Sequence, residues 1–475
     1  MAELHDLTAV ELWRELHHNR LSPREVAAHY IERIQRLNSE LGAFVTLTGE
    51  AALTRADEVA DHVPSTAPLW GLPLADKDLW MRSGVPTAFG SRVMTGFVPD
   101  SSDEIVTQLD TAGAISLGKT AVPEFGLPCY TEPLGQPPAR NPWNLHCGAG
   151  GSSGGAAVAV ASGMLPFAPG SDGGGSIRIP AAACGLVGLK PSRGRIPAGS
   201  GIDSLAGLVV NGPLARTTAD AALLLDGMIT RTGSRIDHHY ALRAPDDGDT
   251  YYLGSAMRAE GRFQLGVMTT SAWDDAYEIV IAPEAHQALR TAVTHLDELG
   301  HGIEEVALEP DATYASAFRT IWQAGAARIP CEGEALSLLE PLTSWLVKRG
   351  RSISARELVD ALATLTAYER SFIRQLALFD AVLTPALALT PRPLGWYDAD
   401  DPENNFAQQV QYTPFTSMVN VTGLPAIVIP ILVTDQGLPM GVQLIGRPGG
   451  ERTLFALASQ LERRVRWDRW RPPVW

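Results

Sequence analysis

Apolar residues follow two different spacings along this chain, and the change from one to the other marks its elements. A spacing of three or four residues predicts helices at 7–37 (as two helices), 50–62, 103–112, 155–163, 219–228 and 283–299, and a largely helical stretch over 310–380. Short apolar runs predict strands at 43–47, 69–79, 114–117, 165–169, 263–268, 303–307 and 381–383. Helices and strands therefore alternate along most of the sequence.

Local signals sharpen some of these boundaries. Ser22-Pro23-Arg24-Glu25 combines a capping box with proline at the first helical position, which predicts a helix start. Residues 230–262 are polar and irregular, which indicates a surface excursion. Residues 385–412 are predicted to be a loop that approaches the functional site.

Composition limits the classes of protein that fit. The chain has 475 residues with a formal net charge of −15, which argues against a surface for nucleic acid or anionic membranes. Four cysteines without a C-x-x-C pair suit a reducing compartment and indicate neither a metal site nor disulfides. The N-terminus does not resemble a signal peptide, and the apolar run at 424–433 is too short to span a bilayer. We expect a cytoplasmic protein that binds no nucleic acid or membrane.

Residues 148–198 contain two glycine clusters that include serines. The first is Gly150-Gly151-Ser152-Ser153-Gly154-Gly155, and the second is Asp172-Gly173-Gly174-Gly175-Ser176. Clustered glycines mark backbone in unusual torsions or in close approach to a ligand, and successive N–H groups can form an anion-binding concavity. A serine hydroxyl beside such donors is suited to acyl transfer, because the donors can stabilise an oxyanion.

These motifs resemble the amidase signature family of serine hydrolases, of the bacterial stand-alone amidase type, over residues 6–463. The resemblance implies a Ser–cis-Ser–Lys catalytic set. Ser176 matches the nucleophile, Ser152 the bridging serine after a cis peptide bond, and Lys77 in Leu-Ala-Asp-Lys-Asp the base. Apolar neighbours of Lys77 can lower its amine pKa and so make it a usable base.

The resemblance also implies the roles of several other residues. The backbone N–H groups of Gly173, Gly174, Gly175 and Ser176 are expected to form the oxyanion hole. Three residues are expected to support the loop through hydrogen bonds, namely Ser153, Asp172 and Arg178. The residues expected to shape the substrate pocket are Gly126, Leu127, Cys129 and Tyr130. Many relatives carry a bulkier residue at the position of Gly173.

Two other motifs fail on context. The residue types of Gly113–Thr120 match the phosphate-loop motif. That motif must follow a strand and begin a helix, whereas here its middle residues are themselves predicted to form the strand. Two G-x-S-x-G matches centre on Ser152 and Ser153. An α/β-hydrolase elbow needs a preceding buried strand and a late histidine, and the last histidine is His301.

The resemblance implies an α/β fold, a single large domain (1–475) with a central mixed β-sheet covered by helices on both faces. Its parts are an N-terminal helical part (1–65), a signature core (66–228) and a variable helical region near the substrate site (310–380).

The expected activity is hydrolysis of a small-molecule carboxamide through an acyl-enzyme, with no cofactor and no metal. The amidase subunit of a glutamine-dependent amidotransferase and an esterase of the same fold are alternatives, and a homodimer is an expectation. Five aromatic residues are candidates for an apolar pocket: Trp322, Tyr397, Phe406, Tyr412 and Phe415.

Overall fold

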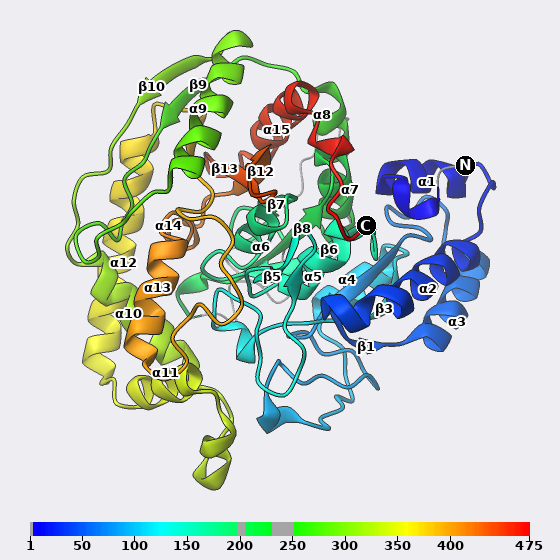
Figure 1. Cartoon of the computed structure of the whole chain (residues 1–475), viewed down its shortest axis with the longest axis horizontal. Coiled ribbons are helices and arrows are strands. Elements are labelled where there is room, and N and C mark those ends of the chain that lie inside the picture. The colour runs from blue at the N-terminus through cyan, green and yellow to red at the C-terminus, as the bar shows by residue number, and fades with distance from the viewer. Residues whose placement is uncertain (1–2, 197–204, 230–250) are drawn as a thin grey trace.

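A mixed sheet of eight strands runs through the middle of the protein (Figure 1). The structure is a computed structural model that describes residues 3–196, 205–229 and 251–475. Within these residues, the strand order of the large sheet is β10-β9-β11-β13-β12-β7-β8-β6. The strands are β6 (Phe167–Asp172), β7 (Val187–Lys190), β8 (Val210–Ala215), β9 (Gln264–Val267), β10 (Gly302–Glu305), β11 (Ala381–Pro385), β12 (Ala426–Val433) and β13 (Pro439–Gly446). The pairs β10–β9 and β9–β11 are parallel and the others are antiparallel.

Two smaller sheets complete the strand inventory of the described residues. In the first, β3 (Ile115–Thr120) lies between β1 (Phe44–Leu47), which is antiparallel to it, and β2 (Pro73–Lys77), which is parallel. The second pairs β4 (Arg140–Asn141) with β5 (Asn144–Gly148). The position of β2 matters most for the site, because its last residue, Lys77, reaches β6 of the large sheet.

Helices surround these sheets. They are α1 (Ala9–His17), α2 (Pro23–Leu41), α3 (Gly49–His62), α4 (Glu104–Thr111), α5 (Gly154–Ala161), α6 (Arg178–Ala183), α7 (Thr218–Met228), α8 (Tyr252–Arg258), α9 (Pro283–Glu298), α10 (Tyr314–Ala326), α11 (Pro341–Arg351), α12 (Ala355–Leu376), α13 (Pro402–Tyr412), α14 (Ser417–Thr422) and α15 (Glu451–Val465). Figure 1 shows α10 to α13 gathered at one end of the protein and α1 to α3 at the other.

The two faces of the large sheet are buried in different cores. Successive residues of a strand point to opposite faces. Accordingly, Leu444 of β13 packs in one cluster with Leu457 of α15, whereas Ile445 packs in another with Phe372 of α12 and Met418 of α14. Helices therefore cover both faces, which confirms the predicted fold class.

Most predicted elements form, and Ser22 caps α2 as expected by accepting a hydrogen bond from the Glu25 N–H. Three strands extend further than predicted, since β3 continues to Thr120, β6 to Asp172 and β11 to Pro385. The extension of β6 is important because it places Ser171 and Asp172 on a rigid strand.

Two predictions of irregular structure are wrong in part. The predicted loop at 385–412 contains α13, whose first residue Pro402 follows Asp401, an N-cap whose side chain accepts from the N–H groups of Glu403 and Asn404. The predicted excursion at 230–262 contains α8, and its part at 230–250 lies outside the described residues. Tertiary packing explains α8, because Tyr252 is buried and its N–H donates to the Asp226 carboxylate.

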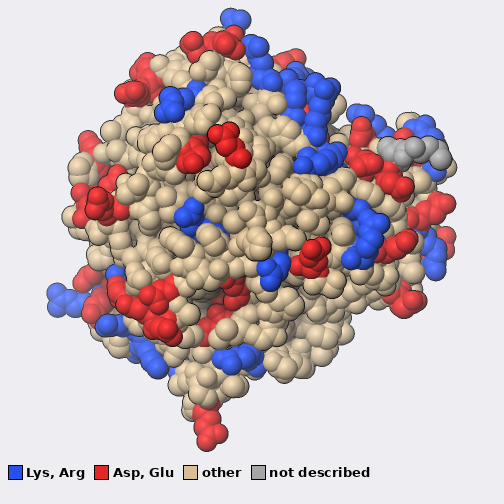
Figure 2. Space-filling view, in the orientation of Figure 1, with Lys and Arg blue, Asp and Glu red and all other residues tan. Residues whose placement is uncertain are grey.

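The surface carries charges of both signs. On the face shown in Figure 2, acidic and basic side chains are interspersed among uncharged residues. Among the helices that the structure describes, none is both long and apolar enough to cross a lipid bilayer.

Candidate active site

Lys77 lies at the end of β2 with its side chain completely buried. Its Nζ donates to Ser152 Oγ at 2.9 Å, to Ser171 Oγ at 3.0 Å and to the Ser171 carbonyl oxygen at 3.1 Å. A charged Lys77 ammonium uses all three of its N–H donors on these acceptors. The neutral amine has two N–H donors and a lone pair, and the lone pair can accept the proton of the Ser152 hydroxyl. The amine is therefore held in one position against Ser152.

Burial lowers the pKa of the Lys77 amine to about 7, and the negative charge of Asp172 only partly opposes this shift. A buried ammonium loses its hydration, so the neutral form is favoured. The carboxylates of Asp76 and Asp78 do not pair with the positive charge of the Lys77 ammonium, because each lies beside another cationic side chain. Asp76 pairs with Arg82 at 2.6 Å, and Asp78 lies 3.5 Å from Lys119. Lys77 is therefore suited to accept a proton near neutral pH.

Ser152 and Ser176 come from the two glycine clusters, which lie side by side. The peptide bond between Gly151 and Ser152 is cis, as the resemblance implied. The N–H of Ser153 donates to the carbonyl oxygen of Ser176 at 3.1 Å, and Ser153 Oγ donates to the Ser171 carbonyl oxygen at 3.3 Å. Ser153 thereby connects both clusters to β6.

The loop Gly173-Gly174-Gly175 leads from β6 into Ser176. Gly175 has φ of +134°, a backbone conformation that residues other than glycine rarely adopt. Its N–H donates to Asp172 Oδ1 at 2.7 Å, so this donor is already occupied. Among the described residues, no acceptor takes the N–H groups of Gly173, Gly174 or Ser176. Of the four expected oxyanion donors, these three are available for a ligand.

A buried ion pair fixes this loop. Arg178 donates to Asp172 through Nε at 3.0 Å and Nη2 at 2.9 Å, and both side chains are fully buried. Burial alone would raise the pKa of the Asp172 carboxyl, but the Arg178 guanidinium outweighs it and holds the pKa below its usual range. Asp172 is therefore a permanent anion that organises the backbone before Ser176.

Residues far along the chain complete the support, and sequence reasoning missed them. Asn420 Nδ2 donates to Asp172 Oδ1 at 2.9 Å, and Arg178 Nη1 donates to Gln443 Oε1 at 2.7 Å. Thr416 Oγ1 donates to the Gly174 carbonyl oxygen at 2.6 Å. Ser171, next to Asp172, was missed as well. No local motif marks these residues, because the contacts with Thr416, Asn420 and Gln443 join positions more than 240 residues apart.

Ser176 lies between two cavities. The first, the aromatic chamber, has a volume of about 60 Å³ and is lined by Leu127, Pro128, Cys129, Gly174, Ser176, Ile179, Trp273, Phe318, Trp322, Phe406, Gln409, Val410, Thr413 and Ser417. The second, the serine chamber, has a volume of about 230 Å³ and is lined by Leu79, Phe125, Gly126, Leu127, Ser152, Ser171, Gly173, Ser176, Leu205, Leu208, Val209, Ile321, Trp322, Gly325, Ala326 and Arg328. Trp322 contacts both chambers.

Three of the four residues expected to shape the pocket line these chambers: Gly126, Leu127 and Cys129. Tyr130 instead lies behind the lining, where its ring stacks on Tyr397 with centroids 4.0 Å apart. Of the candidate aromatic residues, Trp322 and Phe406 line the aromatic chamber, and Phe415 is fully buried in the core. Tyr397 and Tyr412 pack near Cys129.

The phosphate-loop match is excluded by its structure. Gly118, Lys119 and Thr120 lie within β3 rather than at a helix start. Lys119 is buried and donates to the Trp80 carbonyl oxygen and to Thr87 Oγ1. Its role is therefore structural.

Glu3, His5 and His29 are the one group of side chains in the described ranges with a spacing that could hold a metal ion, their ligand atoms lying within 4.8 Å of one another. None of the three lines either chamber.

Comparison with known proteins identifies the class. The 6-aminohexanoate cyclic dimer hydrolase has the same fold, with a TM-score of 0.89 and 29% identity over 100% of both chains. The peptide amidase of Stenotrophomonas maltophilia has a TM-score of 0.80 and 25% identity, with 98% of both chains covered. The protein is thus an amide-hydrolysing enzyme with the amidase signature fold.

The chain belongs to the Amidase family, whose model matches residues 25–455. The putative amidase AmiB2 of Mycobacterium tuberculosis is 36% identical over 453 residues, which cover 94% of this chain and 93% of that protein. A glutamyl-tRNA(Gln) amidotransferase subunit of Chromohalobacter salexigens is 33% identical over 496 residues, which cover 99% of both. The relatives of this chain thus include a protein that is one subunit of a larger enzyme.

Proposed function

We propose that this protein hydrolyses uncharged small-molecule carboxamides by itself, through an acyl-enzyme on Ser176. The observation that carries the proposal is the contact of a buried Lys77 amine, whose pKa is lowered to about 7, with Ser152 Oγ at 2.9 Å. A neutral amine can take a proton from a serine, whereas an ammonium cannot. Ser152 and Ser176 line the same chamber, so a proton relay of Ser176 to Ser152 to Lys77 fits the arrangement.

In the first half-reaction, Ser176 Oγ forms a bond to the amide carbon while its proton moves to Ser152 and the proton of Ser152 moves to Lys77. The negative charge on the carbonyl oxygen is held by the N–H groups of Gly173, Gly174 and Ser176. Loss of one donor of this type typically costs about 10²- to 10³-fold in rate. The C–N bond then breaks as Ser152 returns a proton to the leaving nitrogen and recovers one from Lys77.

In the second half-reaction, water replaces the amine. It adds to the ester carbon of the acyl-enzyme while its proton passes along Ser152 to Lys77. The bond to Ser176 Oγ breaks, the oxygen regains a proton, and a carboxylic acid is released that ionises in solution. Every proton is returned, so the cycle needs no cofactor, metal or external reductant.

The amidase subunit of an amidotransferase is the second candidate, favoured by the 33% identity to the amidotransferase protein of Chromohalobacter salexigens. Glutamine carries an α-ammonium and an α-carboxylate, which a dedicated site would match with charged groups. Among the described residues, no charged side chain lines the aromatic chamber, and Arg328 is the charged residue of the serine chamber. A single cation cannot match both the ammonium and the carboxylate of glutamine, so this lining supports a neutral amide over glutamine.

The test uses the purified chain alone with benzamide, hexanamide and L-glutamine, and it measures ammonia release. We expect turnover of the neutral amides, weak or no turnover of glutamine, and none by Ser176→Ala. Preferential turnover of glutamine, or activity that appears only with a co-purifying protein, would support the amidotransferase instead. Parallel assays with methyl esters of the same acids show whether esters are cleaved too.

A further inference from the structure

The two chambers beside Ser176 differ in which member of the proposed proton relay they contain. Ser152 and Ser171 line the serine chamber and are not among the residues that line the aromatic chamber. Ser176 lines both. Ser152, the group proposed to protonate the leaving nitrogen, is therefore part of the wall of the serine chamber alone.

An amide has two sides, and chemistry fixes which side must face Ser152. The leaving nitrogen needs a proton as the C–N bond breaks, and a general acid must be within hydrogen-bond reach of the atom that it protonates. The substituent of that nitrogen must then extend into the chamber that contains Ser152. The acyl substituent lies on the other side of the carbonyl carbon.

We infer that the aromatic chamber binds the acyl group of the substrate and that the serine chamber binds its amine. The preferred substrates are therefore N-substituted amides whose acyl group is compact and carries no charge. This assignment rests on the proposed function. Trp273, Phe318 and Phe406 give the acyl side apolar, aromatic walls. The volumes of about 60 Å³ and about 230 Å³ make the amine side the larger one.

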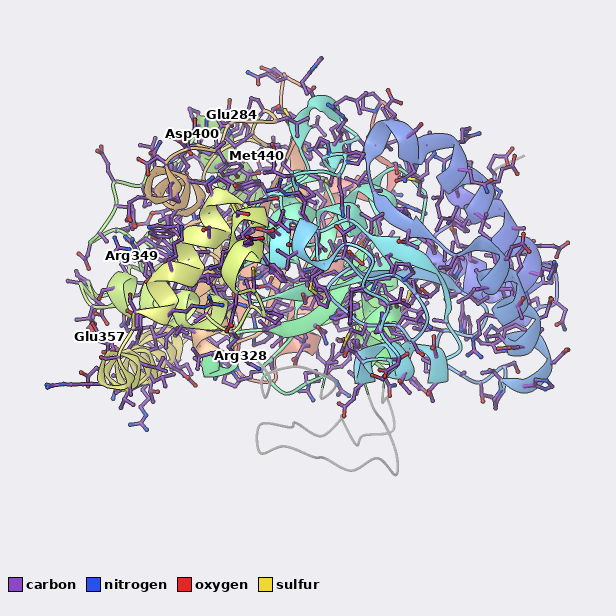
Figure 3. The ribbon with its side chains drawn as sticks, turned by 90° about the horizontal axis from the view of Figure 1, so that it is seen from below. Glu284, Arg328, Arg349, Glu357, Asp400 and Met440 are labelled. Carbon is purple, nitrogen blue, oxygen red and sulfur yellow. The ribbon has the colours of Figure 1, made fainter. Side chains whose placement is uncertain are left out.

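The walls of the amine side are largely apolar, with Leu208, Ile321 and Ala326 among them. Arg328, labelled in Figure 3, lies just beyond the C-terminal end of α10. An apolar or aromatic amine of several carbons therefore suits this chamber better than ammonia does. We therefore expect kcat/KM to rise with each methylene that the amine adds, until the chamber is filled.

One glycine in the serine chamber allows a clean test. Gly325 lies in α10, and a Cβ added there would meet no atom within 4 Å. Leucine is also a better helix former than glycine, so Gly325→Leu should fill the chamber without disturbing the fold. Gly254→Leu is the control, because Gly254 is also helical and lies in α8, outside both chambers. An added Cβ there would meet the flexible end of the Arg258 side chain, whose Nη1 lies 3.3 Å away.

Val410 offers the reciprocal change. It lines the aromatic chamber from α13 and does not line the serine chamber. Val410→Ala enlarges the acyl side at a modest cost in stability. Far-UV circular dichroism and thermal unfolding check that each variant is folded.

The experiment uses two amide series. One keeps an acetyl group and varies the amine from ammonia through methylamine to benzylamine, and the other keeps methylamine and varies the acyl group from acetyl to naphthoyl. In Gly325→Leu, we expect the ratio of kcat/KM for N-benzylacetamide to that for acetamide to fall at least about tenfold, as for a blocked apolar subsite. In Val410→Ala, we expect relative kcat/KM to rise for the bulky acyl groups and not for the bulky amines. Gly254→Leu should match the unchanged protein in both series.

The acyl-enzyme provides a second readout, since it retains the acyl group and has lost the amine. Val410→Ala should change the rate constant of deacylation, whereas Gly325→Leu should act on acylation by bulky amides. If Gly325→Leu discriminates among acyl groups instead, the assignment of the chambers is overturned while the proposed function stands. If Ser176→Ala hydrolyses both amide series at the rate of the unchanged protein, the proposed function itself fails.

Discussion

The pKa of Lys77 predicts how activity depends on pH. If the neutral Lys77 amine is the base, kcat/KM should follow the fraction of Lys77 that is neutral. With a pKa of about 7, that fraction is about one half at pH 7. Below that pH the neutral fraction falls about tenfold per pH unit, so kcat/KM at pH 5 should be about a hundredfold below its plateau. A lysine with its ordinary pKa of about 10.4 would be less than about 0.1% neutral at pH 7. Burial therefore makes the base roughly a thousandfold more abundant.

The assay measures kcat/KM for a neutral amide between pH 5 and pH 9, because a neutral substrate does not titrate in that range. The expected profile has an acidic limb with a midpoint near 7, and circular dichroism at each pH excludes unfolding as its cause. Lys77→Ala should lose at least about 10²-fold in kcat/KM, as expected on removal of a positioned base, and should lose the limb as well. A flat profile from pH 5 to pH 8, or a limb that persists in Lys77→Ala, would show that the Lys77 amine is not the base.

The same shift predicts a dependence of stability on pH. The pKa of Lys77 is lower in the folded state, about 7, than in the unfolded state, where it is near its ordinary value. Between these two values the unfolded chain binds the proton and the folded chain does not. The contribution of Lys77 to the free energy of unfolding therefore rises with pH across that window, and Lys77→Met should remove this part of the slope in urea unfolding experiments.

Three further predictions concern the glycine loop. In Gly175→Ala, the new Cβ would lie 2.6 Å from Thr416 Oγ1, so the loop must shift and displace the oxyanion donors. We expect kcat to fall about 10²- to 10³-fold, while urea unfolding still shows a cooperative transition. Near-normal kcat would contradict the role of the loop. Thr416→Val removes the hydrogen bond to the Gly174 carbonyl oxygen, so it should lower kcat and should lower the free energy of unfolding by about 1 kcal/mol. Thr416→Ser keeps the hydroxyl and should preserve both quantities. Equal effects of the two variants would show that the hydroxyl is unimportant. Asp172→Asn leaves the buried Arg178 guanidinium without its counter-charge and should lower the free energy of unfolding by about 3–5 kcal/mol, measured by urea denaturation; a loss below about 1 kcal/mol would mean that the ion pair contributes little.

Local patterns explain which parts of the fold could be predicted from the sequence. The capping box at Ser22 and the helical spacing of α9 are signals within a few residues, and both helices form. The start of α13 carries a comparable signal, since Asp401 precedes Pro402, but the loop prediction overlooked it. This helix could therefore have been predicted from its own residues.

The site divides in the same way. The glycine clusters and Lys77 stand out in the sequence because their motifs are ordered and mutually spaced. Thr416, Asn420 and Gln443 could not be found, because their importance arises only when β13 and α14 pack against the loop before Ser176. The position of Trp322 between the two chambers likewise depends on tertiary packing of α10, which no local pattern specifies.

Covalent labelling of Ser176 is the most direct test of the proposed nucleophile and its base. The purified chain is treated with a fluorophosphonate, the adduct is located by peptide mass spectrometry, and Ser176→Ala and Lys77→Ala are labelled in parallel. We predict one adduct at Ser176, none in Ser176→Ala and much slower labelling in Lys77→Ala. An adduct at another serine, or none on folded protein, would contradict this mechanism.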